Sequence, residues 1–285
     1  MTNLKLGSVV VGIDGSTHSD TAVTWAARYA AGTHRPLTIV HALGGPDVGR
    51  RLLDPAEARR QARIAARRLG DHALVLAHRV DPDLRVEVLV RTGDPREVLL
   101  DLSEHATLVA VGTRGHGRVA SLLLGSVSAA VATHARCAVA VVRSGREDAS
   151  GVVAGVSGDG SDRAALQLAA DLAASRREPL DAVHAWWVGA GHVDRSVARQ
   201  LAETRGAHER SLAEAVAGLE EKHPEVELRR RLVEGAPVPE LVHRSYAARC
   251  VVLGSRRRTW TRTLLGSVSR AVVEHAHATV VVVPA

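Results

Sequence analysis

Aromatic residues and cysteines are scarce in this sequence. Only 2% of the 285 residues are aromatic, and phenylalanine is absent. Proteins that bind single-stranded nucleic acid stack bases on aromatic side chains, so a nucleic-acid partner is disfavoured despite the formal net charge of +6. The two cysteines, Cys137 and Cys250, stand in no metal-ligand or redox spacing. We expect them to be reduced core thiols rather than parts of a disulfide scaffold or zinc site.

Lysine and long apolar runs are almost missing as well. Lys5 and Lys222 are the only lysines, which excludes a P-loop NTPase because its phosphate loop ends in Gly-Lys-Ser/Thr. No apolar run approaches the roughly 20 residues that span a bilayer, and the first residues lack a signal-peptide core. The sequence therefore predicts a cytoplasmic protein with no membrane segment. The arginine-rich stretch 59–68 predicts a solvated helix face.

The chain is an internal duplication. Its length is about twice the usual size of roughly 150 residues for one domain, and segments of one half recur in the other. Residues 9–15 match 152–158, 36–42 match 179–185, 93–95 match 235–237, 108–112 match 250–254, and 123–128 match 264–269. The polar stretch 144–151 has linker character. We therefore expect domains at residues 1–145 and 150–285.

Each copy alternates short apolar runs with amphipathic segments. In the first copy the predicted strands are residues 9–11, 37–42, 86–90, 108–111 and 138–142, and the predicted helices are residues 20–31, 55–77 and 95–105. Alternating strands and helices predict an α/β fold of two Rossmann-like, doubly wound domains. Each would hold a five-stranded parallel sheet with helices on both faces. Ligands of such sheets bind beyond the carboxyl ends of the strands.

A glycine-rich segment, residues 112–126, leaves a predicted strand and enters a helix. Glycine permits positive φ and lets backbone N–H groups approach an anion, and a helix N-terminus adds unpaired N–H groups. The segment carries Arg114 and Arg118 and no acidic residue. This pattern favours a phosphate site. The alternative is that the glycines merely close the connection between strand and helix.

Asp14 follows the first predicted strand. The turn that contains it lacks the G-x-G-x-x-G pattern of a Rossmann fingerprint, so nicotinamide or flavin binding is disfavoured. A carboxylate at this place suits ribose hydroxyls or a phosphate-bound metal. A turn or helix-capping role is an equal alternative. The dispersed histidines, among them His41 and His184, are expected to have cap or core roles.

The spacing Gly112-x2-Gly115-x9-Gly125-Ser126 resembles the G-x2-G-x9-G-[S/T] signature of ATP-binding universal stress protein domains. With both halves included, the chain looks like a tandem universal stress protein of the kind common in actinobacteria. The resemblance implies ATP, with or without Mg²⁺, whose ribose and adenine meet Gly12, Asp14 and the backbone around Ala42. The candidate residues around the phosphates are Gly112, Thr113, Arg114, Gly115, His116, Gly117, Arg118, Gly125, Ser126, Val127 and Ser128.

The second copy departs from this pattern. Ser157 stands in place of Asp14, and Arg257 stands in place of Gly115. A bulky arginine fills space that the backbone needs to approach a phosphate, so we expect nucleotide to occupy the first site preferentially. The alternative is that Arg256, Arg257, Arg258 and Arg262 bind phosphate themselves. The candidate residues of this copy are Gly155, Gly254, Ser255, Gly266, Ser267, Val268 and Ser269.

The last predicted strand of each copy, 138–142 and 279–283, is a run of apolar residues long enough to need cover if it stood at an edge. Exposed apolar edges invite pairing, so we expect the two copies or two chains to pair there, as a pseudo-dimer or homodimer; the resemblance implies the same.

Three function classes remain: an ATP-binding stress regulator with an unidentified protein partner, a slow ATPase or nucleotidyl-transfer enzyme, and a scaffold with a vestigial site. Residues 112–128 offer only His116 and hydroxyls as reactive groups, so binding is favoured over catalysis.

Overall fold

The computed structural model describes residues 6–44, 55–115, 124–187, 195–255 and 265–284, and the chain divides into two compact units, Met1–Ser144 and Gly145–Ala285. The first unit contains β1 Val9–Ile13, α1 Thr17–Gly32, β2 Leu37–Leu43, α2 Pro55–Val80, β3 Val86–Thr92, α3 Pro95–Ser103, β4 Leu108–Gly112, α4 Ser126–His134 and β5 Ala138–Val142. The second contains β6 Val152–Gly155, α5 Arg163–Arg176, β7 Leu180–Trp186, α6 Arg195–Ala215, α7 Leu219–Lys222, β8 Leu228–Glu234, α8 Pro237–Arg244, β9 Cys250–Ser255, α9 Ser267–His275 and β10 Thr279–Pro284.

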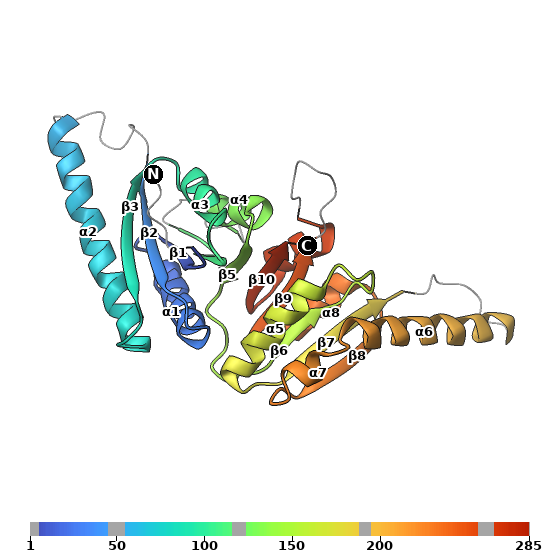
Figure 1. The fold of residues 1–285 in the computed structure, drawn as a ribbon. Helices are drawn as coiled ribbons and strands as arrows, with labels where there is room; N and C mark the ends of the chain where they lie inside the picture. The colour runs from blue at the N-terminus through green and yellow to red at the C-terminus, as the bar shows by residue number, and fades with distance from the viewer. Residues whose placement is uncertain (1–5, 45–54, 116–123, 188–194, 256–264, 285) are drawn as a thin grey trace. The chain divides into compact units, whose positions relative to one another are not determined.

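Each unit is a parallel sheet covered by helices (Figure 1). The strand order is β3-β2-β1-β4-β5 in the first unit and β8-β7-β6-β9-β10 in the second. In the first unit α1 packs against α2, and α3 packs against α4 on the opposite side of the sheet. The expected fold class is confirmed.

The strands form because valine-rich runs are covered on both faces. Val9, Val10 and Val11 of β1 are fully buried, as expected for a central strand of a parallel sheet. In the register, Val9 lies beside Leu37 of β2 and Leu108 of β4. Chain order reverses between β1 and β4, so the switch point of the sheet lies at their carboxyl ends.

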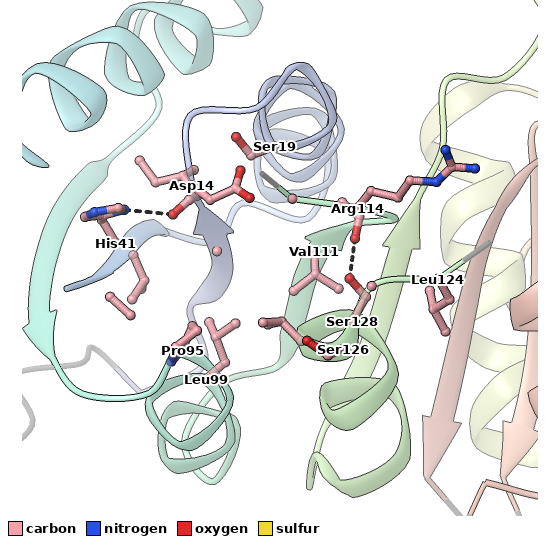
Figure 2. Close-up of a pocket in the computed structure, with 18 residues that line it drawn as sticks. Asp14, Ser19, His41, Pro95, Leu99, Val111, Arg114, Leu124, Ser126 and Ser128 are labelled. Carbon is pink, nitrogen blue, oxygen red and sulfur yellow. Dashed lines mark hydrogen bonds between the residues drawn. The ribbon is translucent and has the colours of Figure 1, made fainter. Parts of the chain in front are cut away.

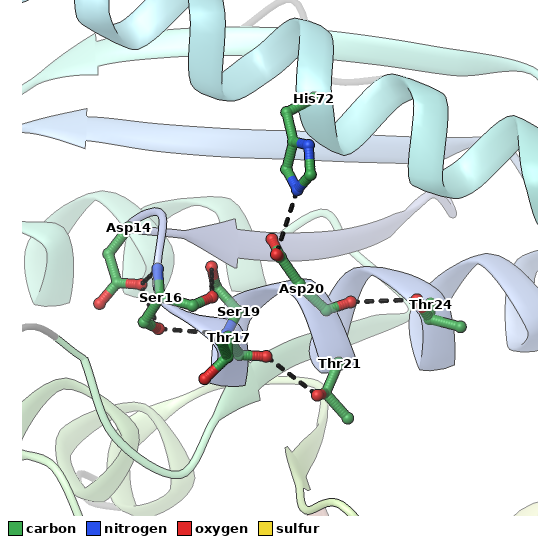
Figure 3. Close-up of polar contacts among 8 residues, drawn as sticks. All are labelled: Asp14, Ser16, Thr17, Ser19, Asp20, Thr21, Thr24 and His72. Carbon is green, nitrogen blue, oxygen red and sulfur yellow. Dashed lines mark hydrogen bonds and ion pairs between the residues drawn. The ribbon is translucent and has the colours of Figure 1, made fainter.

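The helices differ from their predicted bounds at the ends. α1 begins at Thr17, three residues earlier than expected, because the Ser16 side chain accepts a hydrogen bond from the Ser19 N–H. α2 continues to Val80, and α3 ends at Ser103. His72 of α2 contacts Asp20 of α1 at 3.1 Å, which ties these two helices together (Figure 3). In the described part of the chain, no helix has the length and apolar character needed to cross a membrane.

Candidate functional site

A cavity of about 490 Å³ opens at the carboxyl ends of β1, β2 and β4, at the switch point of the first sheet (Figure 2). Its lining residues are Gly12, Ile13, Asp14, Ser19, Val40, His41, Ala42, Pro95, Leu99, Val111, Gly112, Arg114, Gly115, Leu124, Gly125, Ser126, Val127 and Ser128. Most of the residues predicted from the first copy therefore lie around one space. Thr113 is buried and does not line the cavity. His116, Gly117 and Arg118 lie outside the described residues.

Asp14 has a structural role and also faces the cavity. Its Oδ1 accepts hydrogen bonds from the Ser16 backbone N–H at 3.0 Å and from the Ser16 hydroxyl at 2.6 Å (Figure 3). These bonds hold the turn that starts α1. Its Oδ2 lies against the backbone of Gly115, because a Cβ built on Gly115 would be only 2.1 Å from this oxygen. This geometry is therefore compatible both with a role of Asp14 in the turn and with a role in binding a ligand.

The three described glycines of the 112–125 segment, Gly112, Gly115 and Gly125, allow close packing. None of Gly112, Gly115 and Gly125 has a positive φ, so what matters at these three positions is the absence of a side chain. A Cβ on Gly112 would lie 2.8 Å from the backbone carbonyl of His18, so the missing side chain lets the start of α1 approach β4. A Cβ on Gly12 would lie 3.0 Å from Leu99, so this residue is fitted to α3.

The N-terminus of α4 forms one end of the cavity. Gly125 is the N-cap residue and supplies no side-chain hydrogen bond, and the first turn has no acidic residue. The Gly125 N–H donates to the Thr113 carbonyl at 2.7 Å, and the Ser128 hydroxyl donates to the Gly112 carbonyl at 2.6 Å (Figure 2). These two bonds fix the helix start next to β4. The following backbone N–H groups have no side-chain cap, which suits an anion.

The sequence analysis missed part of the apolar wall of the cavity, namely Pro95 and Leu99 of α3 and Val40 of β2 (Figure 2). These residues line the same space as Ala42 and Val127, which were predicted. The recurrence of residues 93–95 as 235–237 was the available signal, because it marks the start of the same helix in both copies. A mostly apolar space with a few polar groups is typical of sites for small ligands.

Arg114 brings a positive charge to the described lining of the first cavity, just after β4. Arg114 is exposed. Burial, with a smaller contribution from the charge of Arg114, lowers the pKa of Arg143, which follows β5, to about 10. His41 donates its Nδ1–H to the Ile13 carbonyl at 2.9 Å. It also lines the cavity. No group of three or more histidine, cysteine or acidic side chains within the described residues is arranged to hold a metal ion.

The second unit has a smaller cavity of about 300 Å³ at the equivalent place. Its lining residues are Gly155, Val156, Ser157, Ser161, Asp162, Val183, His184, Ala185, Pro237, Leu241, Leu253, Gly254, Gly266, Ser267, Val268 and Ser269. Ser255 is buried and does not line it. The four arginines predicted to influence this site, Arg256, Arg257, Arg258 and Arg262, fall outside the described residues. The sequence analysis missed Asp162 because it considered only the strand end, where Ser157 stands in place of an aspartate.

His184 is held differently from His41. Its Nδ1–H donates to the Val156 carbonyl at 2.7 Å, as in the first copy. Its Nε2 then accepts from Nδ1–H of His208 on α6 at 2.8 Å. Burial and the neighbouring His184 lower the pKa of His208, which favours this neutral pair.

Comparison with known proteins agrees with the duplication. The family model described as the universal stress protein family matches residues 6–143 and again residues 151–284. The chain belongs to the universal stress protein family. Universal stress protein Rv2623 of Mycobacterium tuberculosis is 35% identical, with 98% of this chain and 97% of that protein covered. Universal stress protein Rv2005c of the same organism is 36% identical, again with 98% and 97% covered.

A solved universal stress protein has a similar fold. The crystal structure from Archaeoglobus fulgidus superposes with a TM-score of 0.68, covering 97% of this chain and 96% of that chain, at 18% sequence identity. This likeness supports the fold alone. The mycobacterial relatives match over nearly their full lengths, so the present chain has the tandem organisation of these universal stress proteins.

Proposed function

We propose that the first cavity binds ATP, with or without Mg²⁺, and that the protein is a nucleotide-dependent stress regulator rather than a turnover enzyme. The observation that carries the proposal is the combination found around one space at the switch point. A carboxylate, Asp14, lies at one end, an apolar wall that includes Leu99 lies beside it, and the uncapped start of α4 lies at the other end.

Each part suits one portion of a nucleotide. A carboxylate accepts hydrogen bonds from sugar hydroxyls, an apolar wall suits a flat base, and a helix N-terminus suits phosphate oxygens. Arg114 adds positive charge on the phosphate side. A Mg²⁺ ion would accompany the phosphates and complete its shell with water, as this ion usually does. Partner proteins would then respond to the loaded state in the cytoplasm.

Binding is preferred to catalysis because the acid–base groups in the described lining are committed to local structure. Asp14 accepts two hydrogen bonds from Ser16, and His41 donates to the Ile13 carbonyl. The hydroxyl that Asp14 holds, that of Ser16, does not line the cavity, and His41 holds no hydroxyl or thiol, so no pairing of this kind presents a nucleophile to the ligand space. A slow ATPase or nucleotidyl-transfer enzyme, and a scaffold with a vestigial site, are the competing functions.

The test is to count nucleotide and compare rates. We expect protein purified without added nucleotide to release about one ATP per chain on denaturation, as identified by chromatography and mass spectrometry. ATP should dissociate faster than it is hydrolysed. Asp14→Asn keeps the shape of the side chain and should weaken ATP binding in a calorimetric titration.

Three results would overturn parts of the proposal. No bound nucleotide and no uptake on titration would support the scaffold. Turnover faster than dissociation would support the enzyme. Two equal ATP sites per chain would contradict the expected preference for the first site.

A further inference from the structure

The first unit has an edge strand whose charges are self-complementary. β3 stands first in the strand order of this unit and, among the described strands, pairs with β2 alone. Its sequence, VEVLVRT, places Leu89 at the centre, a valine on each side of it, and then Glu87 and Arg91. Neither of these two charged side chains forms an ion pair with any described residue. An open strand edge of this kind can pair with another chain.

The hydrogen bonds between β3 and β2 use the odd-numbered residues of β3. At one end the Leu37 N–H donates to the Arg85 carbonyl at 2.9 Å. At the other end the Gly93 N–H donates to the Leu43 carbonyl at 2.9 Å. The parallel register between the two strands has no bulge, so the bonds alternate regularly from one end to the other. The backbone groups that point to the open edge therefore belong to Val86, Val88, Val90 and Thr92.

The side chains of β3 divide between the two faces of the sheet. Val88 faces α2, because a Cβ on Gly70 would lie 2.6 Å from its Cγ1. Successive side chains of a strand point to opposite faces, so Glu87, Leu89 and Arg91 share the other face. α2 also contacts α1 and β2, so it covers the face of the sheet at β2 and β3. Val88 is nevertheless 36% exposed, which leaves apolar surface at the edge.

We propose that β3 is the docking surface for β3 of a second copy of this chain, in an antiparallel pair whose twofold axis passes through Leu89. Val88 then forms backbone hydrogen bonds with Val90 of the partner subunit, as the outward direction of both residues allows. Glu87 lies directly opposite Arg91 of the partner subunit, and the twofold axis repeats this ion pair. Both ion pairs fall on positions without backbone hydrogen bonds, where opposite side chains are closest.

Other registers lose the match between charges. An axis at Val88 would put Arg91 opposite Arg85 of the partner subunit, and like charges directly opposite destabilise a strand pair. An axis at Val90 would put Arg91 opposite Leu89 of the partner subunit and leave both charges unpaired. The charge pattern of β3 therefore selects one register.

The equivalent edge strand of the second unit has no such match. β8 carries three consecutive arginines, each of which forms an ion pair with an acidic side chain of its own unit: Arg229 with Glu227, Arg230 with Glu220 and Arg231 with Asp181. A twofold axis at the centre of β8 would put arginine opposite arginine. Charged side chains of this kind protect an edge from pairing, so the docking strand is β3 and not β8.

The test measures self-association of the full chain by sedimentation equilibrium. We expect the unchanged chain to dimerise. Arg91→Glu puts two acidic side chains opposite each other at both ends of the pair and should weaken the dimer by about tenfold or more. Glu87→Arg should have the same effect with two basic side chains. An equal mixture of these two variants restores opposite charges at every position and should dimerise again, which misfolded variants could not do.

A second measurement checks the register. Leu89→Cys places a thiol on the twofold axis, where opposite Cβ atoms lie about 4.5–5.5 Å apart. Mild oxidation should therefore join two chains by a disulfide, seen by electrophoresis without reductant. Leu232→Cys on β8 is the matched control and should give no such product, and the unchanged chain reports any contribution of Cys137 and Cys250. Arg28→Glu, an exposed change of the same charge on α1, should leave the dimer intact.

Three results would overturn this proposal. One is a chain that stays monomeric at its highest soluble concentration. Another is a dimer that neither Arg91→Glu nor Glu87→Arg weakens, because its contact would then lie on other strands. The third is a mixture of the two variants that fails to dimerise. ATP binding by both variants should match that of the unchanged chain, since no residue of β3 belongs to the described lining of the first cavity. The two proposals therefore fail independently.

Discussion

The three glycines of the spacing motif have different steric neighbours, although the sequence presents them as one pattern. Gly112 lies against the backbone of His18, Gly115 lies against the Asp14 carboxylate, and Gly125 is the N-cap residue of α4. The contact of Gly115 joins the loop directly to a carboxylate of the cavity. Replacements at these glycines should therefore have unequal consequences.

Gly115→Ala is expected to weaken ATP binding by about tenfold or more with little loss of stability. The added Cβ would stand 2.1 Å from Oδ2 of Asp14, so the loop or the carboxylate must move. Such shifts of positioning groups are costly to binding, whereas Gly115 itself is exposed. Calorimetric titration with ATP and a thermal melt check both parts.

The matched control for that change is Gly145→Ala. A Cβ on Gly145 meets nothing within 4 Å, so both affinity and melting temperature should stay unchanged. Unaltered ATP affinity in Gly115→Ala would show that the close approach of loop and carboxylate is irrelevant to the ligand.

At the scale of elements, the start of α3 decides how the apolar wall is held in each copy. Asp94 caps this helix by accepting a hydrogen bond from the Arg96 N–H at 2.8 Å. Side-chain and backbone hydrogen bonds from Arg96 lower the pKa of Asp94 to about 2. In the second copy the N-cap residue of α8 is Ala236, which has no capping side chain. The helix that contributes to the apolar wall therefore has a side-chain N-cap in the first unit and none in the second.

Asp94→Ala should destabilise the first unit by about 1 kcal/mol, and Ala236→Asp should stabilise the second by a similar or smaller amount. Because the folded-state pKa of Asp94 is below the usual value of 3.8, its contribution is present above pH 3.8 and is lost as the pH falls from there toward 2. Urea denaturation at neutral pH and near pH 3 measures both effects. A destabilisation by Asp94→Ala that is equal at the two pH values would contradict the assigned cause.

At the scale of the whole molecule, the last strand of each unit raises the question of pairing. β5 and β10 each stand last in the strand order of their own unit. Both are valine-rich, and open edges of this kind promote association. The expectation that the copies or two chains pair through these strands stays a prediction.

Hydrogen–deuterium exchange tests that pairing. We expect slow exchange at consecutive amides of residues 138–142 and 279–283, because a paired strand has hydrogen-bonded N–H groups on both sides. Light scattering would then assign the pairing to one chain or to two. Rapid exchange at alternate amides in both strands would show open edges and contradict the prediction.

The fold was predictable because its signals are local and repeated. Apolar runs such as 9–11 and 108–111 predicted buried strands, and the amphipathic segments between them predicted helices. The predicted positions of the helix ends were less accurate, because helix ends depend on capping groups such as the Ser16 hydroxyl. The pattern of apolar residues contains no information about these caps. The glycine spacing located most of the first cavity, since residues at strand ends of a parallel sheet meet at one edge.

The sequence by itself determined the duplication, the α/β class and the strand-end location of the first cavity, because these follow from periodicity, recurrence and the glycine spacing. Only the tertiary structure decided what each glycine packs against, that α3 supplies part of an apolar wall, and that Asp162 lines the second cavity. Those facts depend on contacts between elements far apart in the chain. Ser157 and Asp162, five positions apart, both line the second cavity because the turn between strand and helix brings them within hydrogen-bonding distance.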